Sequence, residues 1–102
     1  MYCVYLTIYK GSKLPPFYIG SSSVKKITNG YHGSVQSYQY KKLWKMELRQ
    51  YPELFKTKII HTSDDRKLCY DKEEKIQRQL NVILNPLYIN LSYANRHFNS
   101  SA

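Results

Sequence analysis

Two β-prone runs near the N-terminus place the strongest limit on the fold of this chain. The residues of Tyr2–Tyr9 are mostly apolar, aromatic or β-branched, and Lys10-Gly11-Ser12 then supplies a turn, which is typical of a strand. A second short run, Phe17-Tyr18-Ile19, ends at Gly20. Because so few residues join the two runs, we expect them to form an antiparallel hairpin.

The next part of the chain indicates a loop and then a helix. The polar stretches Ser21–Ser23 and Thr28–Gly30 are loop-like, and we expect no regular structure there. From about Gln39 to Tyr51, aromatic and apolar residues recur at intervals of three and four, which predicts an amphipathic helix ended by Pro52. A second row at intervals of four is basic and is expected to face outward; its members are Lys41, Lys45 and Arg49.

The second half of the chain predicts one more strand and one more helix. Leu54–His61 reads as a strand, and Thr62-Ser63-Asp64-Asp65 is a good helix entry because its side-chain oxygens can cap free N–H groups. The helix should run to about Asn81, with a short extended segment at Leu87–Leu91. The sequence therefore predicts one α+β domain over residues 1–92, a small three-stranded antiparallel or mixed sheet flanked by helices, with a polar tail over 93–102.

The charge of the chain favours a polyanionic partner. Sixteen Lys and Arg stand against seven Asp and Glu, for a formal net charge of +9. Nucleic acid is the first candidate partner, an anionic membrane surface is the second, and a purely solubilising surface is the alternative to both. No apolar stretch approaches the roughly 20 residues that span a bilayer, so we expect no membrane segment. We also infer no obligatory protein partner from the sequence.

The cysteines and histidines do not indicate a disulfide framework or a zinc site. Cys3 and Cys69 lie far apart with no CxxC partner, which favours buried thiols in a reducing cytosol. The three histidines also stand apart and lack the paired spacing of zinc ligands.

Two adjacent acidic residues, Glu73 and Glu74, lie in the predicted last helix, and helical geometry separates them. The expected apolar side of this helix consists of Leu68, Cys69, Ile76, Leu80 and Ile83. At roughly 100° per residue, the centre of that side lies about 70° from Glu73, whereas Glu74 lies nearly opposite. Glu73 is therefore the carboxylate at the buried margin, either as a ligand or as a partner for a Lys or Arg.

Taken in order, these features resemble the GIY-YIG nuclease superfamily, and most closely its phage-type homing endonucleases. Cys3-Val4-Tyr5 corresponds to the first triplet, and Tyr18-Ile19-Gly20 is the YIG triplet unchanged. Glu73 begins a stretch similar to the glutamate helix of the family, and Tyr88-Ile89-Asn90 is similar to its asparagine motif. The run Asn29–Val35 also resembles the phage-type members, and the likeness covers nearly all of residues 1–92.

The resemblance implies a metal-dependent endonuclease that hydrolyses phosphodiester bonds of double-stranded DNA. Glu73 would hold a single divalent ion, Mg²⁺ or Mn²⁺. Tyr5 would accept a proton from the attacking water and Tyr18 would position water or phosphate, while Asn90 would orient the helix and the sheet. A phenol has a pKa of about 10, so Tyr5 would need a nearby cation, and Lys10 and Lys26 both qualify.

One position departs from the family pattern, because His32 stands where an arginine clamps the scissile phosphate. Imidazole lacks the permanent charge and forked donors of a guanidinium. In one interpretation, Lys25 or Lys26 serves instead or the chain is a family member that uses histidine. In the other, activity is weakened. The expected DNA contacts are the two loop lysines and the basic row of the first helix.

Two other functional classes remain open from the sequence. The first is a DNA-binding module that keeps the nuclease fold without catalysis. The second is a basic RNA-binding protein of ribosomal type, which would prefer structured RNA to duplex DNA.

Overall fold

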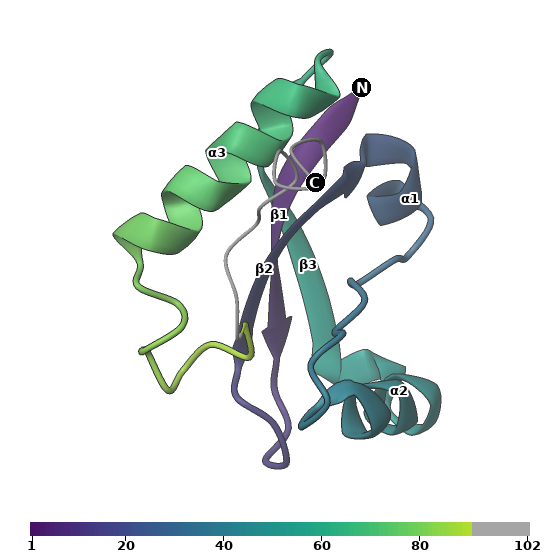
Figure 1. Ribbon diagram of the computed structural model, residues 1–102. Coiled ribbons are helices and arrows are strands. Elements are labelled where there is room, and N and C mark those ends of the chain that lie inside the picture. The colour runs from purple at the N-terminus through teal and green to yellow at the C-terminus, as the bar shows by residue number, and fades with distance from the viewer. Residues whose placement is uncertain (91–102) are drawn as a thin grey trace.

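A three-stranded antiparallel sheet in the order β2-β1-β3 forms the centre of the protein in the computed structural model, which describes residues 1–90 (Figure 1). The strands are β1 (Tyr2–Tyr9), β2 (Phe17–Ser23) and β3 (Phe55–Ser63). β1 lies in the middle because both of its faces are apolar, so that it is buried by contacts above and below the sheet. The predicted hairpin and the α+β class are both confirmed.

Three helices flank this sheet. The longest, α3 (Arg66–Gln79), runs alongside it, whereas α1 (Val24–Thr28) and α2 (Lys41–Gln50) lie near opposite ends of it (Figure 1). A short 3-10 turn, η1 (Pro52–Leu54), joins α2 to β3. Asp65 caps α3 by accepting the Lys67 N–H at 2.9 Å, as the acidic helix entry predicted. No helix within residues 1–90 is long and apolar enough to cross a bilayer.

The sheet separates two clusters of buried side chains. One cluster lies between the sheet and α3 and consists of Val4, Ile19, Cys69 and Val82. The other joins the sheet to α2 and the preceding loop, and its buried members are Tyr9, Leu14, Val35, Trp44, Phe55 and Ile89. α2 and α3 are therefore each held by a core of their own.

The loop expected after the YIG triplet is in fact strand followed by helix. Ser21–Ser23 continue β2, because their backbone pairs with residues of the buried central strand, with Tyr2 opposite Ser23. Ser23 then caps α1 by accepting the Lys26 N–H at 3.2 Å. The prediction was wrong here because serine has low strand propensity and because α1 has no buried residue to give a periodic signal.

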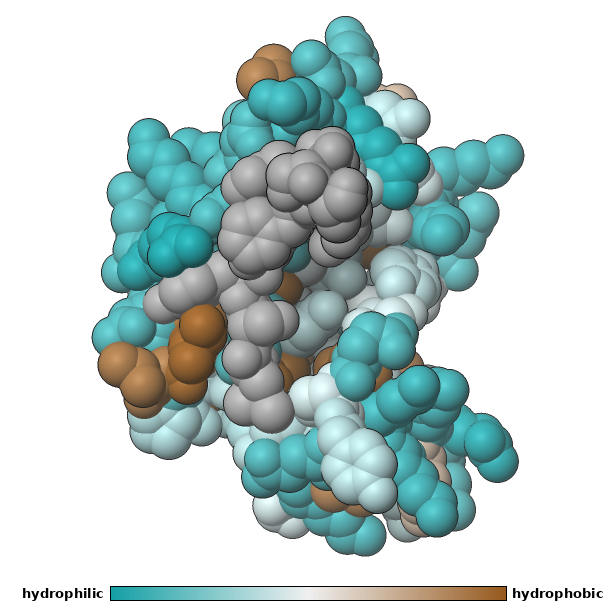
Figure 2. All heavy atoms as spheres, in the orientation of Figure 1, coloured by the Kyte–Doolittle hydropathy of each residue, from teal (hydrophilic) through white to brown (hydrophobic). Residues whose placement is uncertain are grey.

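The apolar side predicted for the last helix was right for Cys69 and Ile76, which belong to or pack against the buried cluster, and wrong for its other members. Leu68, Leu80 and Ile83 are exposed, and the buried residues of α3 are Cys69, Glu73 and Gln77. These three are spaced four residues apart and form one face of the helix. Apolar side chains gather instead on the surface over the segment that follows α3 (Figure 2), where Leu80, Ile83, Leu84 and Leu87 are exposed.

The last described segment runs beside the outer edge of β2. Phe17 forms a parallel bridge with Tyr88, with bonds from Phe17 N to Leu87 O at 3.0 Å and from Ile89 N to Phe17 O at 2.8 Å. As far as it is described, the extended segment predicted at Leu87–Leu91 therefore pairs with β2 through a short parallel bridge. The tail predicted over 93–102 lies outside the described residues.

A buried hydrogen bond between Tyr9 and Glu47 fastens α2 to the sheet. The Tyr9 hydroxyl donates to Glu47 Oε1 at 2.5 Å, and both residues are buried. We expect Tyr9→Phe to lower the free energy of unfolding by about 1–3 kcal/mol, because the buried carboxylate loses its donor. Urea unfolding followed by circular dichroism would measure this loss. Tyr38→Phe, which changes an exposed phenol, is the control and should leave the midpoint unchanged; equal midpoints for the two variants would contradict the assignment.

Candidate active site

The two signature tyrosines lie against each other on one face of the hairpin. Tyr5 is paired with Gly20 and Thr7 with Tyr18, so the two rings are diagonal neighbours with centroids 6.3 Å apart. The Tyr5 ring crosses Gly20, since a Cβ built on that glycine would lie 2.5 Å from the Tyr5 hydroxyl. Only glycine leaves room for the phenol, which therefore extends over β2 toward the outer edge of the sheet.

The loop after α1 covers this tyrosine pair. The Tyr31 ring meets Tyr5 edge-on at 6.3 Å, and Lys26 Nζ lies 5.6 Å from the centre of the Tyr31 ring. Gly33 has a φ of 109°, and a Cβ there would lie 2.8 Å from both the Tyr5 hydroxyl and the Tyr18 ring. Lys26 is therefore the cation beside the tyrosine cluster, whereas Lys10 follows the far end of β1, where its N–H donates to Leu54 O at 2.8 Å.

Burial raises the pKa of Tyr5 far above its ordinary value, and the neighbouring phenols of Tyr18 and Tyr31 and the carboxylate of Glu73 raise it further. Only 2% of Tyr5 is exposed. In this environment Tyr5 is a protonated phenol that can donate a hydrogen bond. Removal of its proton requires additional positive charge close to the oxygen.

Glu73 reaches the same part of β2 from the opposite face of the sheet. Its Oε1 accepts the Ser21 hydroxyl at 2.7 Å, its Oε2 accepts the Gln77 amide at 3.0 Å, and the residue is only 5% exposed. Gln77 also donates to Ile19 O at 3.3 Å, which ties this face of α3 to the strand. Tyr5 at Gly20 and Glu73 at Ser21 thus meet adjacent residues of one strand.

The carboxylate of Glu73 suits a hard divalent cation. Within residues 1–90, no group of three or more His, Cys, Asp or Glu side chains forms a metal cage. A single carboxylate fits an ion such as Mg²⁺, which keeps several of its waters and binds few protein ligands. Neutral donors such as Ser21 and Gln77 orient a carboxylate without cancelling its charge, so these residues fit the ion that the sequence predicted.

Asn90 is buried and binds the backbone of the YIG triplet. Its Oδ1 accepts the Ile19 N–H at 3.0 Å, and its Nδ2 donates to Ile19 O at 2.8 Å. The side-chain amide therefore pairs with the outer edge of β2 as a neighbouring peptide group would. These bonds hold Asn90 to the sheet one residue away from Gly20, and its role in orienting the helix and the sheet around a site stays a prediction.

His32 lies away from this edge of the sheet. Its Nδ1 is 2.6 Å from Thr57 Oγ1, and its ring centroid is 5.9 Å from that of Phe55, so the imidazole lies over β3. Its backbone carbonyl accepts the Thr7 hydroxyl at 2.7 Å. The structure therefore packs Tyr5 against Tyr18 and bonds Glu73 to the neighbouring strand residue Ser21, but it does not bring the His32 side chain to this edge.

The environment of His32 predicts a loss of stability at acid pH. Burial lowers its pKa below 6.5, so the unfolded chain takes up the proton before the folded protein does. The contribution of His32 to the free energy of unfolding is complete above pH 6.5 and falls as the pH decreases below that value. Chemical unfolding measured at steps between about pH 7.5 and about pH 5, the range in which histidine titrates, would reveal this loss.

The control for this experiment is a pair of glutamine variants. His32→Gln should flatten the decline of stability with falling pH, while His61→Gln, which retains the His32 imidazole, should keep it. Identical pH profiles for the native protein and His32→Gln would show that this side chain does not couple folding to protonation.

The predicted DNA-contacting residues form two separate basic surfaces. Lys25 and Lys26 belong to α1 and are exposed, whereas Lys41, Lys45 and Arg49 are exposed on α2. Hydrophilic side chains cover the α2 end of the face in view (Figure 2). Because α1 and α2 lie near opposite ends of the sheet, one nucleic-acid molecule would have to extend along the sheet to contact both.

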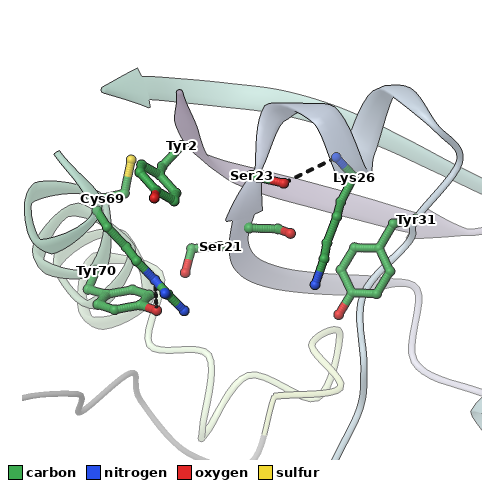
Figure 3. A pocket seen from close by; sticks show the side chains of 9 residues that line it. Tyr2, Ser21, Ser23, Lys26, Tyr31, Cys69 and Tyr70 are labelled. Atoms are coloured by element: carbon green, nitrogen blue, oxygen red, sulfur yellow. Dashed lines mark hydrogen bonds between the residues drawn. The ribbon is translucent and has the colours of Figure 1, made fainter. Parts of the chain in front are cut away.

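A pocket of about 290 Å³ opens at the end of β2, between α1 and the start of α3 (Figure 3). Lys26 and Tyr31 enter it from one side, and Tyr2 and Tyr70 from the other. Its remaining lining consists of Ser21, Ser22, Ser23, Arg66 and Cys69. Since Ser21 also donates to Glu73, the pocket adjoins the candidate metal ligand.

Both cysteines are buried free thiols, as expected, and burial raises the pKa of each. A protonated thiol is a poor nucleophile and a poor metal ligand. Cys3 and Cys69 are therefore packing residues.

Three residues around the site were missed or left without a role by the sequence interpretation. Gln77 follows Glu73 by four positions, a spacing that places the two on one helix face and could have indicated the contact. The contacts of Tyr31 with Tyr5 and of Arg66 with Tyr2 gave no such signal, because β1 is distant from both residues in the sequence.

Comparisons with protein-family models, curated proteins and solved structures gave no match to this chain. The resemblance to the GIY-YIG nucleases therefore stays a prediction from the motifs of the sequence.

Proposed function

We propose that this protein is a metal-dependent endonuclease that hydrolyses phosphodiester bonds of double-stranded DNA. The supporting observation is the convergence of Tyr5 and Glu73 on adjacent residues of β2, the first over Gly20 and the second bonded to Ser21. This arrangement joins a carboxylate, phenol groups and a basic surface, which are the residue types that phosphodiester hydrolysis needs. The buried free thiols are in keeping with action in a reducing cytosol.

In this proposal Glu73 holds the divalent ion, Mg²⁺ or Mn²⁺. The ion, when bound, would offset charge on the phosphate and lower the pKa of a coordinated water. Ser21 and Gln77 hold the carboxylate in position through the bonds at 2.7 and 3.0 Å. Asn90 keeps the strand that carries this site in register with the segment beside it.

The tyrosines handle protons and position the substrate. Because burial raises the pKa of Tyr5, it acts as a base only when a cation lies near its oxygen, and Lys26, which lies over the Tyr31 ring, is the candidate in the cluster. Tyr18, whose hydroxyl donates to Ser34 O at 3.3 Å, borders the same space and would position water or phosphate. The exposed lysines of α1 and the basic row of α2 would contact the DNA backbone.

A supercoiled plasmid tests the proposal directly. The protein should convert it to nicked or linear DNA with Mg²⁺ or Mn²⁺ and leave it intact when EDTA removes the ion. DNA binding without any metal-dependent cleavage would overturn the nuclease proposal and favour a binding module that keeps the fold. Stronger binding to structured RNA than to duplex DNA would point to the third class.

A further inference from the structure

Positive charge borders the pocket at the end of β2 on both sides. Lys26 enters it from α1, and Arg66 enters from the first turn of α3. Ser21, Ser22 and Ser23 also line the pocket, and no acidic side chain of residues 1–90 does so (Figure 3). Two cations that line a pocket without a carboxylate among its lining residues form a suitable environment for a phosphate group.

Arg66 is held in place by aromatic neighbours. Its guanidinium carbon lies 5.9 Å from the centre of the Tyr2 ring and 5.2 Å from that of Tyr70, and its Nε donates to the Tyr70 hydroxyl. These contacts use the Nε and the face of the guanidinium group, so its two terminal amino groups can still bind an anion as a fork. Within residues 1–90, no carboxylate forms an ion pair with Arg66.

The pocket is connected to the candidate active site through a single side chain. Ser21 lines the pocket and donates to Glu73 Oε1 at 2.7 Å. A phosphate bound between Arg66 and Lys26 would therefore lie next to the residues proposed to hold the divalent ion.

We propose that Arg66, with Lys26 opposite, binds a backbone phosphate of the nucleic-acid substrate in this pocket. Arg66 then supplies the forked guanidinium that the sequence led us to seek at His32, whose ring lies over β3 instead. The inference rests on the proposed nucleic-acid substrate, but not on its cleavage.

Binding of a short DNA duplex in EDTA tests the role of Arg66 without any catalysis. We expect Arg66→Gln to weaken binding about tenfold at low salt and to reduce the slope of log affinity against log salt by about one, because one phosphate contact is lost. Arg66→Lys keeps the charge, so it should keep the slope while recovering only part of the affinity.

The matched control is Arg78→Gln, which removes the same charge from the same helix outside the pocket, where Arg78 pairs with Glu74. The inference is overturned if Arg66→Gln loses no more affinity than Arg78→Gln and leaves the salt slope unchanged. Unfolding midpoints of both variants should equal that of the native protein, because both arginines are exposed.

The plasmid assay separates this inference from the proposed nuclease activity. A loss of binding in Arg66→Gln, together with no cleavage by the native protein, supports the phosphate pocket and overturns the nuclease. Cleavage by the native protein, together with unchanged binding in Arg66→Gln, overturns the pocket alone.

Discussion

Glu73→Gln should lower the rate of metal-dependent cleavage by at least about two orders of magnitude, because it removes the charge proposed to hold the divalent ion. The substitution preserves shape and hydrogen bonding. A glutamine at this position can accept the Gln77 amide through its oxygen and donate to the Ser21 hydroxyl through its nitrogen. The free energy of unfolding should therefore change little, and the loss should appear in the rate of cleavage.

The neighbouring carboxylate provides the control for this prediction. Glu74 lies on the outer side of α3 and pairs with Arg78 at 2.9 Å, so Glu74→Gln should cleave at the native rate. Single-turnover nicking measured over a range of Mg²⁺ concentrations would compare the two variants. Native activity in Glu73→Gln, or equal losses in both variants, would remove Glu73 from the proposed metal site.

Gly33→Ala should destabilise the protein by roughly 2–6 kcal/mol, the sum of a strained backbone and an overpacked site. The φ of 109° is unfavourable for alanine, and its Cβ would lie 2.8 Å from the Tyr5 hydroxyl and from the Tyr18 ring. Neither ring can easily withdraw, since Tyr5 is buried and Tyr18 packs on Trp44 with centroids 5.6 Å apart. A loss of this size is a large fraction of the roughly 5–15 kcal/mol that stabilises a small domain.

Gly30→Ala separates the two contributions to that loss. Gly30 also has a positive φ, 97°, but a Cβ there would meet nothing within 4 Å. Gly30→Ala should therefore lower the free energy of unfolding only by the cost of the strained backbone, about 1–3 kcal/mol. Urea unfolding of the two variants gives the difference, which measures the clash with the tyrosines. If Gly30→Ala costs as much as Gly33→Ala, the tyrosine pair is not packed against this loop.

The parts of the fold that were predicted correctly follow from local chemistry. Tyr2–Tyr9 is apolar on both faces, which identifies a buried strand, and Asp65 caps α3 as its carboxylate predicts. Pro52 follows the end of α2 for the same kind of local reason, since proline cannot continue a helix.

The parts that were missed depend on contacts between distant residues. Ser21 belongs to a strand because Val4 pairs with it, and the buried face of α3 carries Glu73 and Gln77 because β2 offers them hydrogen-bonding partners. Helical angles still selected Glu73 over Glu74, although two of the leucines used to define the apolar side, Leu68 and Leu80, are exposed.

The location of His32 could not be predicted for the same reason. Nothing in its own segment indicates Thr57 or Phe55, which come from β3 and are brought near only by the order of the strands. The guanidinium of Arg66, which lines the pocket at the end of β2, comes from α3, so its position also depends on the tertiary fold.

The hydrogen bonds of Asn90 to Ile19 also affect whether two molecules of this protein can associate through the edge of the sheet. The outer edge of a sheet is a template for strands of other molecules, and sheet proteins must block it to stay monomeric at high concentration. One side-chain amide here occupies both the N–H and the C=O of Ile19. Asn90 thereby also blocks the pairing of a strand from another molecule at this position of β2, which opposes intermolecular sheet growth and aggregation.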